Sequence, residues 1–309
     1  STGVSGHANP HSYTYTWQPQ GILISHLAEH KRAVNKLSLS HDMFFLTSAS
    51  DDGTCKIWDC RKLEKDISFK SRLTYSHQGG RILSCVSLMH SKESVASASS
   101  DGTVHVWNVE YSTRQGVPEK YNGITRIGNV AKSAGSGVES EGAALNLCLC
   151  GEHVLCYATE HGKIHGYDHR QGKDAWELQV NPSHGILRSM FCESKNQSWL
   201  ATISSFGVVS VLDLRFLMCA KQWQHPNKKG VHAMIPFNDV IASENSSESC
   251  RALISAGEHE TAVWNIFDGR CEQVFRNLGV DEKAYERNPI SCSSALPVSG
   301  RNLSELDAG

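Results

Sequence analysis

A pattern that occurs five times constrains this 309-residue chain more than any other feature. Each copy has a run of small or polar residues, a tight turn, and an alternating stretch that ends in a large residue followed by Asp or Asn. The two clearest copies run from Ser48 to Asp59 and from Ser97 to Asn108, and both carry Asp-Gly in the turn. Repetition at a nearly fixed distance predicts one structural unit copied along the chain.

The spacing of the copies indicates the size of that unit. Their final large residues are separated by 49, 60, 45 and 52 residues: Trp58, Trp107, Tyr167, Leu212 and Trp264. A four-stranded blade of a WD-repeat propeller takes about 40–45 residues, so the excess belongs in loops. The widest interval contains residues 112–142, which are rich in Gly, Ser and Lys, and a flexible loop is predicted there.

Alternating segments upstream of the turns supply the other strands. In the first four copies these are 34–39 with 44–47, 82–88 with 94–97, 145–149 with 154–158, and 186–191 with 199–203. The fifth copy is less regular and has a polar insertion around 243–249. No long amphipathic helix pattern is present, so the predicted fold class is all-β, a WD-repeat β-propeller.

Polar residues at fixed places in the first two copies predict a hydrogen-bonded set that fixes each turn. An indole N–H, a hydroxyl, an imidazole and a turn carboxylate can satisfy one another in series. The predicted structural residues are His30, Ser48, Asp52 and Trp58 in the first copy, and Ser97, Asp101 and Trp107 in the second, with His77 as a shifted partner. The same residue types could form a Ser/His/Asp catalytic triad, but their place in a strand-turn-strand hairpin favours the structural role.

The last three copies have lost this set. His161 and Phe206 stand where the turn Asp would be, and Glu258 is a conservative replacement in the fifth copy. We therefore expect apolar packing to hold those blades. His161, His165 and His169 recur every four residues, but on a strand they spread along about 13 Å, so no metal site is predicted. Phosphate-binding loops and paired carboxylates are also missing from the sequence, and we predict no catalytic residue and no cofactor.

The ends of the chain and its composition bound the domain. Residues 1–16 are predicted to be a disordered tail, and residues 17–309 an incomplete propeller. Residues 21–26 resemble an outer strand that closes the ring, while 290–296 and 303–308 resemble two strands of a sixth blade. The chain is thus expected to hold about five blades and part of a sixth, ending mid-blade, from a seven-bladed ring; a complete five- or six-bladed ring with a degenerate tail is the alternative.

Charge and cysteine usage point to a soluble intracellular protein. The formal net charge is −2, and no apolar run is long enough to cross a membrane. Such a balance argues against a nucleic-acid partner. The eleven cysteines are an odd number and lie mostly in apolar runs, so they are expected to be reduced and buried.

Several off-pattern segments carry a family resemblance over about residues 17–308. They are 17–27, 29–35, 72–75, 79–81, 157–159, 174–176, 213–216 and 225–226. Together they resemble the C-terminal propeller of the protein-kinase-like regulatory subunits of class III (vacuolar-sorting) phosphatidylinositol 3-kinases, and residues 61–75 look closest to plant-type members.

This resemblance implies a non-catalytic scaffold. In that family the propeller docks beclin-type coiled-coil subunits and supports the lipid kinase in endosomal and vacuolar sorting and in autophagy. The implied location is the cytoplasm, peripherally on endosomal, vacuolar and autophagic membranes. The family's N-terminal kinase-like domain is absent from this sequence, so no enzymatic activity is expected of this chain.

A repeated Asp-x-Arg ending supports a different reading. It occurs at Asp59 to Arg61, Asp168 to Arg170 and Asp213 to Arg215, and it resembles the substrate receptors of cullin-RING ubiquitin ligases. Alternatively, each Arg pairs with its own Asp and caps the strand end, or contacts another subunit of the lipid-kinase complex. The shared register makes Arg61, Arg170 and Arg215 a candidate partner-binding rim.

Overall fold

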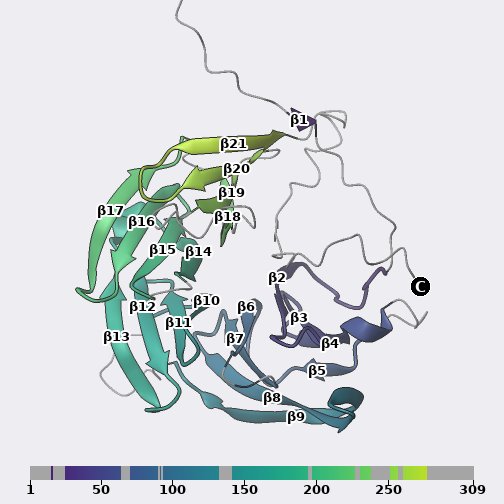
Figure 1. Ribbon diagram of the computed structural model, residues 1–309. Helices are drawn as coiled ribbons and strands as arrows, with labels where there is room; N and C mark the ends of the chain where they lie inside the picture. The colour runs from purple at the N-terminus through teal and green to yellow at the C-terminus, as the bar shows by residue number, and fades with distance from the viewer. Residues whose placement is uncertain are drawn as a thin grey trace, which may run out of the picture.

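Five β-sheets make up the described part of this chain, as a computed structural model shows (Figure 1). The structure describes residues 15–16, 25–63, 70–89, 91, 93–131, 141–193, 197–226, 230–237, 251–256 and 260–276. Each sheet has four antiparallel strands in chain order, and the last sheet also takes up the short parallel strand β1 (Tyr15–Thr16). The first strands of the five four-stranded sets lie nearest a common centre and the fourth strands lie further out. This is the blade arrangement of a WD-repeat β-propeller, so the predicted fold class is confirmed.

The strands of each blade are consecutive in the sequence. Blade 1 contains β2 (Val34–Leu39), β3 (Phe45–Ser50), β4 (Cys55–Asp59) and β5 (Leu73–Tyr75). Blade 2 contains β6 (Ile82–Ser87), β7 (Ser94–Ser99), β8 (Val104–Arg114) and β9 (Val117–Asn129). Blade 3 contains β10 (Ala144–Cys150), β11 (Val154–Thr159), β12 (Lys163–Asp168) and β13 (Lys173–Gln179). Blade 4 contains β14 (Leu187–Cys192), β15 (Trp199–Ser204), β16 (Val208–Asp213) and β17 (Met218–Gln224). Blade 5 contains β18 (Val231–Pro236), β19 (Arg251–Ala256), β20 (Glu260–Asn265) and β21 (Cys271–Arg276).

The core of the protein lies between neighbouring blades. One apolar cluster joins each consecutive pair, built from side chains of the facing sheets. Hydrogen bonds between first strands reinforce the packing. The Asn35 amide donates to Ile82 O at 2.8 Å, the Asn146 amide to Leu187 O at 2.9 Å, and Ser189 Oγ to Met234 O at 2.7 Å. The blades are therefore fixed to one another near the centre.

A bulge recurs where the first strand of every blade pairs with the second. One extra residue stands in each first strand: Asn35, Leu83, Leu145, Arg188 and His232. Bulges bend a strand and increase its local twist. Asn, Leu, Arg and His all occur among these five residues, so position in the blade rather than a residue preference determines the bulge.

The loop predicted over residues 112–142 is in large part a hairpin. β8 and β9 extend the third and fourth strands of blade 2 and pair from His105–Asn129 to Arg114–Val117. Tyr111 and Tyr121 face each other across the hairpin with ring centroids 5.7 Å apart, and both pack against the cluster between blades 1 and 2. This packing outweighs the Gly- and polar-rich composition on which the loop prediction was based. Residues 132–140 lie outside the described part.

Other boundary predictions meet the structure only in part. Tyr15–Thr16, in the predicted N-terminal tail, form β1, which pairs in parallel with β21. In the predicted closing strand 21–26, residues 25 and 26 are not in a strand, and 21–24 lie outside the described residues. The two strands expected at 290–296 and 303–308, and the insertion at 243–249, also lie outside them.

Candidate functional site: turn networks and a shared blade face

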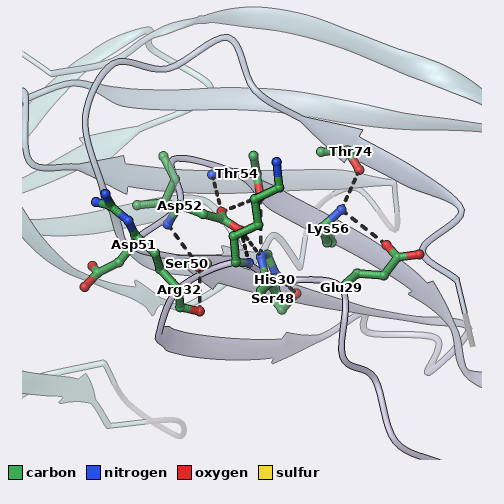
Figure 2. A network of polar contacts seen from close by, with 12 residues as sticks. Glu29, His30, Arg32, Ser48, Ser50, Asp51, Asp52, Thr54, Lys56 and Thr74 are labelled. Atoms are coloured by element: carbon green, nitrogen blue, oxygen red, sulfur yellow. Dashed lines mark hydrogen bonds and ion pairs between the residues drawn. The ribbon is translucent and has the colours of Figure 1, made fainter.

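The structure brings the four predicted residues of blade 1 into one chain of hydrogen bonds, of which Figure 2 shows His30, Ser48 and Asp52. Ser48 lies on β3, Trp58 on β4, and Asp52 in the turn between them, while His30 comes from the segment before β2. Trp58 Nε1 donates to Ser48 Oγ at 2.8 Å; His30 Nε2 lies 2.7 Å from Ser48 Oγ, and His30 Nδ1 lies 2.9 Å from Asp52 Oδ2. With a neutral imidazole, the carboxylate makes Nδ1 the donor and Nε2 the acceptor from Ser48.

The Asp52 carboxylate is the most heavily bonded group of this set. It accepts the Thr54 hydroxyl at 2.6 Å, the Thr54 amide at 3.0 Å and the Lys31 amide at 3.0 Å, besides the His30 ring. Burial alone would raise the pKa of Asp52, but the hydrogen bonds from Thr54 and His30 outweigh it, so the pKa lies well below its usual range. Asp52 therefore fixes the turn as a carboxylate.

Asp52→Ala should reduce the free energy of unfolding by about 1–3 kcal/mol, because it leaves buried donors without an acceptor. Because the pKa of Asp52 is lower in the folded than in the unfolded state, its carboxylate stabilises the fold at pH values above the unfolded pKa of about 3.9. This stabilisation is lost as the pH falls through the folded-state pKa. The difference in free energy of unfolding between wild type and variant, measured by denaturant titration, should therefore be present at pH 7 and become smaller below about pH 4. Asp101→Ala is the matched control, since Asp101 is exposed and, within the described residues, its carboxylate accepts only from Thr103; equal losses for both variants would contradict this role of Asp52.

A second network ties the segment before β2 to blade 1 (Figure 2). Lys56 Nζ donates to Glu29 Oε2 and to Thr74 Oγ1, both at 3.2 Å, and Ser71 Oγ donates to the same Glu29 oxygen at 2.5 Å. Burial acts to raise the pKa of Glu29, and the bonds from Ser71 and Lys56 lower it on balance. The network positions Glu29, and with it the neighbouring His30.

In blade 2, a glutamine takes the place of the histidine. Trp107 Nε1 donates to Ser97 Oγ at 3.0 Å, and Ser97 Oγ donates to Gln78 Oε1 at 2.7 Å. The Gln78 amide donates to Thr103 Oγ1 at 3.0 Å, and Thr103 in turn donates to Asp101. His77, the predicted partner, instead sets its ring edge against Tyr75. Gln78 was missed because a histidine was expected at this place and His77 is the adjacent residue.

The remaining blades rely on other contacts. His161 and Phe206 are exposed, and Glu258 lies outside the described residues. Trp264 Nε1 has no hydrogen-bond partner in the described part of the chain; its ring stacks on Trp223 at 5.3 Å and contacts His225 at 4.8 Å. Blade 5 is thus held by aromatic packing at the place where blade 1 has its polar set.

Blade 3 has a charged network of its own, centred on a buried histidine. The His165 side chain is 0% exposed; its Nε2 lies 2.7 Å from Glu141 Oε2 and its Nδ1 lies 3.1 Å from Asp174 Oδ2. Lys163 Nζ bridges Glu141 and Glu177 at 3.1 Å each. Burial would lower the pKa of His165, but the bonds to Asp174 and Glu141 raise it overall, so the ring is favoured as imidazolium.

Among the described residues, one group of three side chains could together hold a metal ion, and it belongs to this network. Atoms of His165, Asp174 and Glu177 lie within 4.8 Å of one another. Each of these carboxylates already has a partner, since Lys163 pairs with Glu177 and His165 with Asp174. The arrangement is that of an ion-pair network around a buried histidine. The sequence carried no signal for it, because only the strand register places His165 opposite Glu177.

Each of the three rim arginines pairs with the aspartate two residues before it. The N···O distances are 3.3 Å for Arg61 with Asp59, 2.9 Å for Arg170 with Asp168, and 2.6 Å for Arg215 with Asp213. Hydrogen bonds from the arginines lower the pKa values of Asp168 and Asp213 to about 2. The local pairing is the geometry expected of strand-end caps.

The three arginines differ in how much they offer to a partner. Arg170 and Arg215 side chains are 62% and 66% exposed, whereas Arg61 is 29% exposed. Arg61 lies over the Phe44 ring and donates to Pro118 O of the β8–β9 hairpin. Its guanidinium therefore joins blades 1 and 2, and only Arg170 and Arg215 present a largely free surface.

Exposed apolar side chains collect on the face that carries these arginines. In an up-and-down blade, the turn between strands one and two and the turn between strands three and four lie at the same end. Most of the large exposed apolar residues of the described chain lie in these turns or at the first residue of the strand that follows: Met43, Met89, Val117, Phe216, Leu217 and Met218. We call this end of the blades the arginine face. Phe206 lies in a turn at the opposite end.

The two helices in the described part are three-residue 3-10 turns, Cys60–Lys62 (η1) and Pro182–His184 (η2), so neither could cross a bilayer.

Comparison with known proteins agrees with this architecture. The family model described as WD domain, G-beta repeat, matches residues 21–59 and 69–108. These segments hold the two Asp-Gly turns and the two tryptophan-anchored networks described above. The later blades, which lack those residues, are not matched.

Relatives match over much more of the chain. It is 37% identical over 266 residues to "Serine/threonine-protein kinase VPS15" of Arabidopsis thaliana, which covers 84% of this chain and 17% of that protein. It is 34% identical over 275 residues to "Probable serine/threonine-protein kinase vps15" of Dictyostelium discoideum, and the match covers 89% of this chain and 13% of that protein. "Putative serine/threonine-protein kinase VPS15" of Komagataella pastoris is 26% identical over 277 residues, and the match covers 84% of this chain and 19% of that protein.

This chain spans less than a fifth of each of these relatives. The described part consists of propeller blades and is not itself a catalytic kinase domain. The chain carries WD repeats in its first two blades and is similar over most of its length to part of the proteins named VPS15 serine/threonine-protein kinase.

Proposed function

We propose that this chain is a non-catalytic scaffold within a VPS15-type protein and that it binds protein partners through the arginine face. Exposed Met43, Met89 and Phe216 to Met218 lie at the same end of the blades as Arg170 and Arg215, and this shared end carries the proposal. Exposed Met, Phe and Arg side chains are residue types enriched at protein interfaces. Blades tied together near the centre hold these side chains in a fixed arrangement.

The partners proposed are the catalytic subunit of a class III phosphatidylinositol 3-kinase and beclin-type coiled-coil subunits. The VPS15 relatives and the WD repeats support a scaffold or regulatory role of this kind. An extended coiled coil suits an arc of turns, since it can contact several blades at once. In this proposal the chain acts in the cytoplasm and reaches endosomal, vacuolar or autophagic membranes only through the complex.

The test is co-purification of the full-length protein from its own cells, comparing wild type with Arg170→Gln/Arg215→Gln. Loss of two interface arginines should weaken capture of the lipid kinase or of the coiled-coil subunit roughly tenfold. Stability should change little, because both guanidinium groups are largely exposed and the Arg170 and Arg215 amides still donate to Asp168 and Asp213. Arg61 is left intact, since its removal would also break the contact between blades 1 and 2.

Arg32→Gln/Arg81→Gln is the matched control. Both side chains are exposed, and their backbone carbonyls accept from the turns at the opposite end of blades 1 and 2, from Ser50 Oγ and the Ser100 amide. If the two double variants lose the same partners to the same extent, the arginine face is not the docking site. Recovery of a cullin adaptor in place of a lipid kinase would instead support the ubiquitin-ligase reading of the Asp-x-Arg endings.

A further inference from the structure

A group of four cysteines lies between blades 3 and 4, apart from the arginine face. Cys148 and Cys150 lie on β10, Cys156 on β11 and Cys192 on β14, and all four belong to the apolar cluster that joins these two blades. Cys148 stands opposite Cys156 in the β10–β11 register. One pair crosses the interface, where the Cys192 thiol donates to Cys150 Sγ at 3.0 Å.

The crossing pair is placed for bond formation. Cys150 and Cys192 are the last residues of β10 and β14, the adjacent first strands of their blades. A disulfide has a sulfur–sulfur distance of about 2.05 Å, so the two sulfurs need to approach by only about 1 Å. Neighbouring carbonyls orient both thiols, since Cys192 Sγ lies 3.5 Å from Trp199 O and Cys150 Sγ lies 4.0 Å from Gln197 O.

The surroundings also give the two thiols different pKa values and different burial. Hydrogen bonds from Cys156 and Cys192 lower the pKa of Cys150, and the same bond raises the pKa of Cys192. The thiolate is the reactive form of cysteine. Cys150 is buried and Cys192 is half-buried, so a small oxidant can approach from the Cys192 side.

We propose that Cys150 and Cys192 form a reversible redox site, a dithiol that a hydroperoxide oxidises to a disulfide between blades 3 and 4. In the first step Cys150 sulfur attacks one oxygen of the hydroperoxide. An S–O bond forms and the O–O bond breaks. The leaving oxygen takes a proton, as water when the oxidant is hydrogen peroxide. Cys150 becomes a sulfenic acid.

In the second step Cys192 sulfur attacks the sulfur of that sulfenic acid. The S–S bond forms, the S–O bond breaks, and the hydroxide leaves with the Cys192 proton as water. The two thiols lose two electrons in total and the peroxide gains them. A dithiol reductant reverses the reaction by two thiol–disulfide exchanges. The sulfurs are already in contact, so no strand has to move far in either direction.

The disulfide would close a loop between positions 42 residues apart, which contains the other three strands of blade 3. A cross-link of this length stabilises a native protein mainly by restricting the unfolded chain. We expect the melting temperature to rise by about 5 °C on oxidation and to return when the bond is reduced.

The experiment treats the full-length protein with hydrogen peroxide, blocks remaining thiols with iodoacetamide in denaturant, and maps the peptides by mass spectrometry. A Cys150–Cys192 linked peptide that dithiothreitol removes is expected. Cys192→Ser should abolish the linked peptide and leave Cys150 as a sulfenic acid that dimedone labels. Cys219→Ser is the control, since exposed Cys219 on β17 lies in a different strand of blade 4 and should leave the linked peptide unchanged.

Two results would overturn the proposal. One is complete alkylation of Cys150 and Cys192 after a peroxide dose that oxidises Cys219. The other is a linked peptide that joins Cys192 to Cys148 or Cys156 and not to Cys150. Both are read from the wild-type protein, so they stand even if a serine variant fails to fold.

Discussion

Trp107→Ala should lower the free energy of unfolding by about 3–5 kcal/mol, the usual cost of removing a buried tryptophan. Trp107 is fully buried in blade 2, and its ring stacks on Tyr75 of blade 1 with centroids 4.8 Å apart. Its indole N–H also ends the chain of hydrogen bonds through Ser97 and Gln78. The substitution therefore removes a contact between two blades and a buried donor at once. Denaturant titration of the chain measures the loss.

Two further variants separate these contributions. Trp107→Phe keeps an aromatic ring against Tyr75 but removes the N–H and part of the buried ring volume, so it should cost about 2 kcal/mol, less than Trp107→Ala. Phe216→Ala removes an aromatic side chain that is 71% exposed, and it should change stability by no more than about 0.5 kcal/mol. If Trp107→Ala cost as little as Phe216→Ala, the stack between blades 1 and 2 would not contribute to stability.

His165→Gln should cost about 3 kcal/mol near pH 6, the lower end of the range for a broken buried ion pair. The lower end applies because Glu141 and Asp174 keep 15% and 16% of their side chains exposed. Without the imidazolium, these two carboxylates and Glu177 face one another with only Lys163 between them. Glutamine can keep a hydrogen bond to one carboxylate but supplies no charge.

The pH dependence tests the charge directly. The raised pKa of His165 contributes stability that is fully present below the unfolded pKa of about 6.5 and is lost as pH rises through the folded value. The wild type should therefore lose stability above neutral pH, and His165→Gln should lack this slope. His161→Gln, at an exposed position four residues earlier, should retain it. An unchanged slope in His165→Gln would assign the pH dependence to other groups.

The fold was predictable because its signal is local. Asp-Gly turns followed by an alternating strand and a tryptophan need only about a dozen consecutive residues, and they indicate the hairpin of the second and third strands. The same turns indicate where Ser48 and Ser97 must lie, since each serine stands ten residues before its tryptophan. The predicted first strands then follow from alternation over six residues.

The parts of the site that escaped prediction depend on distant pairing. Gln78 replaces a histidine, and only the fold shows that its amide reaches Ser97 and Thr103. Glu141 meets His165 from 24 residues upstream, and Cys150 meets Cys192 across a blade interface. The hairpin of residues 104–129 was missed for a related reason. Its composition suggested a loop, but its tyrosines pack against the cluster between blades 1 and 2, and this contact between distant residues favours paired strands.

The pairing of β1 with β21 also sets an order of events during synthesis. Tyr15 pairs with Phe275 and Thr16 with Arg276, so 260 residues separate the partners in each case. Ribosomes add about 5–20 residues per second, and the N-terminal strand must therefore wait on the order of 13–50 s for its partner to be made. Blades 1 to 4 can be complete by then, each from its own consecutive strands. Among the described strands, the sheet that is completed last is the one that takes up β1, which is made before all the others.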